Sequence, residues 1–162
     1  MKDRYLILIS IVLVILQTTA LPFLRIAGVA FSLPLIFLIS GTVVFGHWKG
    51  LRIAIYLGVC LDILIGRGLG VYVFLYLSIS YIISSFEEKI FKDNFVTPII
   101  LFVFAAFFET LYFLIYQYMS TGYAIGFRAF LVNFVVYSLY NGIPGIPVYS
   151  YFMKKYMGYS MR

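Results

Sequence analysis

Long apolar runs follow one another along the chain, and short segments with Lys, Arg, Asp or Glu separate them. Runs of this length and hydropathy predict helices that cross a lipid bilayer. The pattern predicts spans at about residues 5–24, 31–46, 51–65, 69–86, 96–118 and 129–153. We therefore expect an all-α membrane protein, with six transmembrane helices in one bundle that takes up residues 1–162.

Composition agrees with this prediction and excludes a soluble globular protein. Hydrophobic residues make up 64% of the 162 residues, and only 11% are charged. The net charge of +6 comes from Lys and Arg residues that stand singly or in pairs among apolar runs. Because they form no basic stripe, we expect the lipid bilayer and not nucleic acid as the surrounding partner.

The basic residues also predict an orientation. A cytoplasmic amino terminus places nine Lys and Arg residues inside: Lys2, Arg4, Lys49, Arg52, Lys89, Lys92, Lys154, Lys155 and Arg162. Only Arg25, Arg67 and Arg128 then lie outside. Since cytoplasmic loops are enriched in Lys and Arg, we expect a multi-pass protein with both termini in the cytoplasm.

The stretch from Gly50 to Tyr81 contains small residues at every fourth position, interrupted by one acid. The series is Gly50, Ala54, Gly58, Asp62, Gly66 and Gly70. Positions four apart share one face of a helix, so these residues predict a groove that admits a neighbouring backbone. An ionisable group in such a groove faces protein, which makes Asp62 a candidate for helix packing or for direct contact with a partner.

A second acid, Glu109, interrupts the fifth apolar run. With the expected orientation, Asp62 and Glu109 both lie in the outer halves of their helices, near the side that holds Arg25, Arg67 and Arg128. These arginines are candidate partners of the two carboxylates, and the spacing leaves the pairing open. Because buried charges usually pair within a protein, we favour a packing role for both acids.

Helix breakers concentrate in the last apolar run, where Asn141-Gly142-Ile143-Pro144-Gly145-Ile146-Pro147 occurs. Proline removes a backbone donor and clashes with the preceding turn. We therefore expect a break or kink in the sixth span, at Asn141, Pro144 and Pro147.

The residues needed for catalysis or metal binding are missing. His47 is the only histidine and Cys60 the only cysteine. The Gly66–Gly70 segment lacks the Lys-Ser/Thr of a phosphate-binding loop, so it is interpreted as a turn. With no nucleophile and base and no cluster of metal ligands, we expect neither an enzyme nor a cofactor or metal site.

The whole pattern resembles the rod shape-determining protein MreD family. The likeness rests on a G-x7-G-x3-D-x3-G-x3-G pattern with a following Tyr, formed here by Gly50, Gly58, Asp62, Gly66, Gly70 and Tyr81. Gln17 near the end of the first span, Pro34 at the start of the second, and the Asn141–Pro147 segment before a basic tail add to it.

This resemblance implies a non-enzymatic subunit of the elongation machinery (elongasome) in the bacterial inner membrane, which supports peptidoglycan synthesis and cell shape. It implies binding to MreC, and work in one complex with MreB, RodA and a class B penicillin-binding protein. It also implies a fold similar to the substrate-binding subunits of energy-coupling-factor transporters. A vitamin-like small-molecule carrier is therefore the alternative, although the first span lacks the Ala-x-x-x-Ala pattern usual in those subunits.

Overall fold

A computed structural model describes residues 3–24, 31–65, 68–86, 96–123 and 126–158. In these residues the chain forms six α-helices and one short 3-10 helix, which confirms the predicted all-α class. The elements are α1 (Asp3–Thr19), η1 (Leu21–Leu24), α2 (Leu33–Phe45), α3 (His47–Ile65), α4 (Val71–Ser85), α5 (Val96–Thr121) and α6 (Phe127–Met157).

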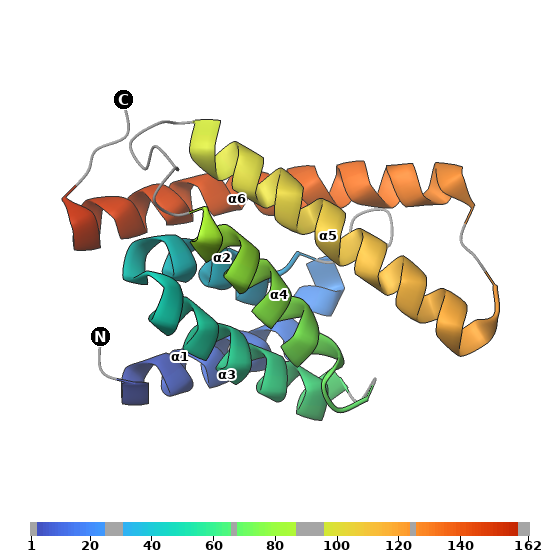
Figure 1. The fold of residues 1–162 in the computed structure, drawn as a ribbon, viewed down its shortest axis with the longest axis horizontal. Helices are drawn as coiled ribbons and strands as arrows, with labels where there is room; N and C mark the ends of the chain where they lie inside the picture. The colour runs from blue at the N-terminus through green and yellow to red at the C-terminus, as the bar shows by residue number, and fades with distance from the viewer. Residues whose placement is uncertain (1–2, 25–30, 66–67, 87–95, 124–125, 159–162) are drawn as a thin grey trace.

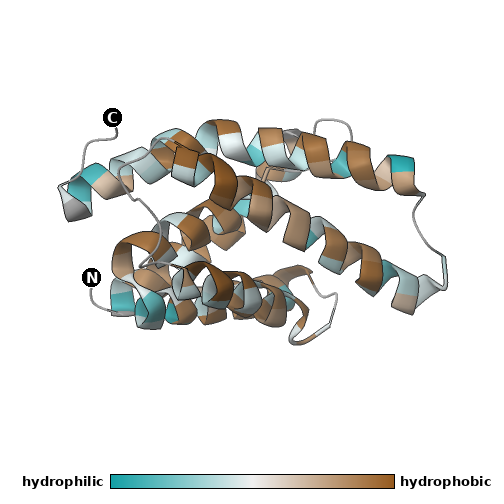
Figure 2. Ribbon diagram, turned by 45° about the horizontal axis from the view of Figure 1, so that its top comes forward, coloured by the Kyte–Doolittle hydropathy of each residue, from teal (hydrophilic) through white to brown (hydrophobic). Residues whose placement is uncertain are grey.

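Successive helices run in opposite directions along one bundle (Figure 1). As a result, the first turn of α1 and the last turn of α6 lie at the same end of the molecule, on the left of Figure 1. Helices α5 and α6 pack against each other and extend beyond α1 to α4 at the opposite end. Hydrophobic residues occupy much of the length of the helices (Figure 2), as expected for a bundle that contacts lipid.

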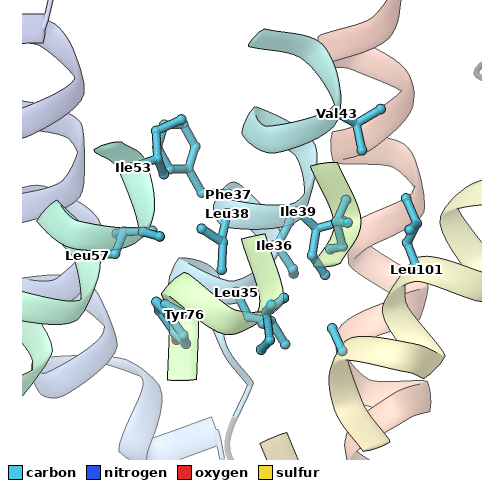
Figure 3. Packing of buried hydrophobic residues seen from close by; sticks show 14 of the residues in the cluster. Leu35, Ile36, Phe37, Leu38, Ile39, Val43, Ile53, Leu57, Tyr76 and Leu101 are labelled. Carbon is cyan, nitrogen blue, oxygen red and sulfur yellow. The ribbon is translucent and has the colours of Figure 1, made fainter. Parts of the chain in front are cut away.

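Helix α2 lies at the centre of the bundle, and eleven of its 13 residues are buried. Its apolar side chains point in every direction around the helix axis, because it meets other helices on all sides. In Figure 3 the labelled α2 side chains lie between Ile53 and Leu57 of α3 on one side and Leu101 of α5 on the other. Pro34 stands at the first turn of α2, after the N-cap Ser32, which confirms the predicted place of this proline.

The helices differ greatly in length. By length and composition, Arg4–Phe23, Val96–Thr121 and Phe127–Tyr156 could each cross a membrane, whereas Leu33–Phe45 and Val71–Ser85 are shorter apolar helices. At a rise of 1.5 Å per residue, the 13 residues of α2 extend about 20 Å, less than the roughly 30 Å of a hydrocarbon core. The combination of long and short apolar helices is that of a helical membrane protein.

The helix breakers of the last run do not end its helix, and a kink at Asn141, Pro144 and Pro147 stays a prediction. Helix α6 continues without interruption from Phe127 to Met157, with Pro144 and Pro147 inside it. In an apolar environment no water is available to form hydrogen bonds with the backbone. A continuous helix is therefore the best way to provide partners for the N–H and C=O groups around Pro144 and Pro147. The same segment contributes to packing instead: a Cβ on Gly145 would lie 2.3 Å from the ring of Phe102, so only glycine admits this ring of α5.

Candidate functional site

One face of α3 carries the small residues and the acid that the sequence placed four apart. Gly50, Ala54, Gly58 and Asp62 are all buried, and we call them the small-residue face of α3. The face packs against α4, which runs beside α3 in the opposite direction (Figure 1). Asp62 is only 4% exposed, so its carboxylate lies within the protein and away from lipid.

Two glycines of this face let atoms of neighbouring helices come close. A Cβ on Gly58 would lie 2.5 Å from Cα and 2.8 Å from the amide nitrogen of Val73, both backbone atoms of α4. A Cβ on Gly50 would lie 2.8 Å from Cγ2 of Thr42 and 3.0 Å from Oγ of Ser80. The hydroxyls of Thr42 and Ser80 are themselves 3.1 Å apart, so Gly50 leaves room for a polar contact between α2 and α4.

The carboxylate of Asp62 caps the amino-terminal end of α4. The amide of Gly70 donates to Oδ2 over 2.8 Å, the amide of Tyr72 donates to Oδ1 over 2.8 Å, and that of Val73 lies 3.4 Å from Oδ2. The first amides of a helix have no partner within the helix, and the helix dipole makes this end positive. A carboxylate therefore finds hydrogen bonds and favourable charge here from the backbone of α4.

The cap comes from α3 because α4 cannot supply its own. The N-cap residue of α4 is Gly70, which has no side chain to accept a hydrogen bond. Its φ of +97° lies in the left-handed region that favours glycine. Gly70 thus provides the turn that leads into α4, and the amides of the first turn donate to Asp62 instead of to an N-cap side chain.

The structure locates only part of the proposed pairing between acids and arginines. Arg25, Arg67 and Gly66 lie outside the described residues. Arg128 is exposed at the start of α6. The partners that the structure shows for Asp62 are backbone amides of α4.

A second polar centre holds the start of α2. The Gln17 side chain of α1 donates to the carbonyl of Phe31 over 2.7 Å and accepts from the amide of Leu33 over 3.0 Å. From the opposite side, Oδ1 of Asn141 in α6 accepts from the amide of Ser32 over 2.7 Å. The chain that enters α2 is therefore fixed between α1 and α6.

Glu109 belongs to this second centre. It is 8% exposed, and its carboxyl group lies beside the hydroxyl of Tyr137 in α6. Ser32 lies close to the side chains of both Tyr137 and Tyr76. Asp62 and Glu109 thus sit in two different polar clusters, and α4 contributes to both of them.

The sequence pointed to some of these residues and missed others. The fourfold spacing singled out Gly50, Ala54, Gly58 and Asp62. Ser32, Tyr76 and Tyr137 carried no signal, because serine and tyrosine are frequent in this chain and their partners lie far away in sequence. The contact of Ser32 with Asn141 joins residues 109 positions apart.

Comparison with known proteins adds the family. The model of the family described as rod shape-determining protein MreD matches residues 2–159. No curated protein matches the chain, and no solved structure matches it. Because the family match extends over nearly the whole chain, including the small-residue face and both polar centres, the chain belongs to the rod shape-determining protein MreD family.

Proposed function

We propose that this protein is a non-enzymatic membrane scaffold of the bacterial elongation complex, and that it binds MreC and supports peptidoglycan synthesis. The observation that carries the proposal is the family match over residues 2–159. Proteins of this family determine rod shape, and they are not known as enzymes. MreB, RodA and a class B penicillin-binding protein are the further proposed members of the complex.

The buried acids support a scaffold. Both carboxylate oxygens of Asp62 accept hydrogen bonds from the backbone of α4, which makes Asp62 a structural link between two helices. Glu109 of α5 lies beside Tyr137 of α6. A carboxylate held by fixed backbone donors, as that of Asp62 is, is better suited to holding helices in place than to proton transfer or to binding a substrate.

The arrangement of the helices supports the proposed location. The helices alternate in direction, and the ends of α1 and α6 lie together (Figure 1). With nine of twelve basic residues on the side of the termini, we place both termini in the cytoplasm and the protein in the inner membrane as a six-span bundle. The proposed likeness to the substrate-binding subunits of energy-coupling-factor transporters rests on the family resemblance alone.

Copurification tests the proposal. A tagged chain is extracted in mild detergent from membranes of the bacterium that encodes it, and the proteins and small molecules that remain bound are quantified. If the protein is a scaffold, MreC, a protein with a single membrane span, should copurify in amounts comparable to the tagged chain. A bound vitamin or an associated ATPase module, with no MreC, would contradict it and indicate a carrier.

A variant with a disrupted fold provides the control for this experiment. Gly58→Leu places a large side chain against the backbone of Val73, so it should lose MreC together with its thermal transition. Ile63→Leu changes a lipid-facing residue of the same helix, 67% exposed, and should retain both. Loss of MreC in the Ile63→Leu variant would mean that the interaction depends on the outer face of α3.

A further inference from the structure

Aromatic side chains join helices α4 and α5 at one end of the pair. There the hydroxyl of Tyr112 donates to the carbonyl of Val71 over 3.0 Å, and the rings of Phe74 and Tyr112 stack with centroids 6.2 Å apart. These contacts connect the first turn of α4 to the second half of α5. Because the two helices run in opposite directions, the end of α4 and the start of α5 lie at the other end of the pair (Figure 1).

A pocket of about 200 Å³ lies at that other end. Only apolar side chains line it: Ile82, Ile83 and Phe86 of the α4 end, and Ile100, Leu101 and Phe104 of α5. Ile83 and Leu101 are buried, whereas Phe86 and Ile100 are 54% and 61% exposed. The pocket therefore has a closed floor within the bundle and a rim on its outer surface.

Neither water nor empty space suits such a pocket. A buried water needs two to four polar partners, and the lining offers none. If the pocket stayed empty, its walls would lose dispersion contacts on one side. An apolar cavity of about 150 Å³ already holds a benzene molecule, so a pocket of this size accommodates a stretch of hydrocarbon chain.

The surroundings supply that hydrocarbon. This family is a membrane family, α5 is long and apolar enough to cross a bilayer, and the rim of the pocket faces outward. We propose that the pocket binds one acyl chain of a phospholipid, which fills the space between the end of α4 and the start of α5. The chain is a resident part of the packing and not one of the exchanging lipids around the protein.

Photolabelling in detergent tests this site. The purified full chain is incubated with a trace of phosphatidylethanolamine that carries a diazirine in its acyl chain, in excess detergent, and labelled peptides are identified by mass spectrometry. We expect labelling to concentrate at residues 82–86 and 100–104. Ile100→Trp fills the pocket and should lower this labelling several-fold, whereas Ile99→Trp, on the neighbouring position outside the lining, should leave it unchanged.

Thermal unfolding of the same variants gives an independent readout. Removal of lipid should lower the Tm of the wild type, and added phosphatidylethanolamine should restore it. Ile100→Trp, or Ile82→Phe if the tryptophan variant does not fold, should show a smaller shift. Labelling spread evenly over the outer surface, equal in both tryptophan variants, would overturn the proposal.

Occupation by a partner protein is the other outcome that would overturn it. In that case the pocket would be labelled only in the chain purified alone, MreC would abolish the labelling, and Ile100→Trp would lose MreC. The proposed scaffold would survive that result, since only the occupant of the pocket would change. Failure of the scaffold itself would show in copurification, with lipid labelling unaffected.

Discussion

The side chain of Asp62 caps the start of α4, as the side chain of an N-cap residue caps its own helix. Asp62 itself belongs to the neighbouring helix α3. Its two oxygens meet the amides of Gly70 and Tyr72 at 2.8 Å each. Because Gly58 lies one turn earlier on the same face, α3 comes close enough for the short aspartate side chain to reach. The capping of α4 by Asp62 thus depends on the close approach of the two helices at Gly58.

Removal of the Asp62 carboxylate should destabilise the fold. Asp62→Ala leaves the amides of the first turn of α4 without acceptors, at a cost of about 1–3 kcal/mol. Asp62→Asn keeps one acceptor oxygen and should lie between the wild type and the alanine variant. Thermal unfolding in detergent measures the order. Equal stability of all three proteins would show that the cap contributes nothing.

Replacement of Gly58 should lower the stability of the fold even when the new side chain is that of alanine. The Cβ of Gly58→Ala would lie 2.5 Å from backbone atoms of Val73, which cannot rotate away, so overpacking of about 1–3 kcal/mol is expected. Gly142→Ala is the matched control in α6, where the nearest atom is 4.0 Å away. This control should be stabilised by up to about 1 kcal/mol through helix propensity. Similar unfolding temperatures for the two variants would refute close packing at Gly58.

Helix α2 depends on side chains from outside it. The segment that leads into α2 is held by Gln17 from α1 and by Asn141 from α6. A 13-residue helix that does not reach across a bilayer needs such partners for the backbone groups at its start. The two amide side chains provide them.

Gln17→Leu tests this role. Leucine is similar in volume but cannot bind the carbonyl of Phe31 or the amide of Leu33, so the free energy of unfolding should fall by about 1–3 kcal/mol. Gln117→Leu makes the same change at an exposed position of α5 and should have little effect. A Gln17 variant as stable as the Gln117 variant would mean that α2 is fixed by its apolar packing alone.

The helices themselves could be predicted from the sequence because charged residues mark their ends. Every predicted span corresponds to a helix of the structure, with ends that differ by a few residues. The role of the Asn141–Pro147 segment in packing could not be predicted, because proline and glycine indicate only a weakened helix, whereas in the structure Asn141 binds Ser32 and Gly145 admits Phe102. Local propensity carries no information about such distant partners.

The alternating helices and the basic residues predict on which side of the membrane each end of a helix lies. After Cys60→Ala, single cysteines are introduced as Arg128→Cys at the start of α6 and Lys155→Cys at its end. A membrane-impermeant maleimide added to spheroplasts should label position 128, and it should label position 155 only after the inner membrane is permeabilised. The reverse pattern would invert the orientation, and labelling of both positions would exclude a membrane-crossing α6.

Hydrogen exchange at the start of α4 shows whether Asp62 of α3 caps this helix. The amides of Gly70, Tyr72 and Val73 lie in the first turn, so their protection has to come from Asp62 and not from the helix. We predict slow exchange in residues 70–73 of the wild type and much faster exchange there in Asp62→Ala, with the middle of α4 unchanged. Equal exchange in both proteins would contradict the account.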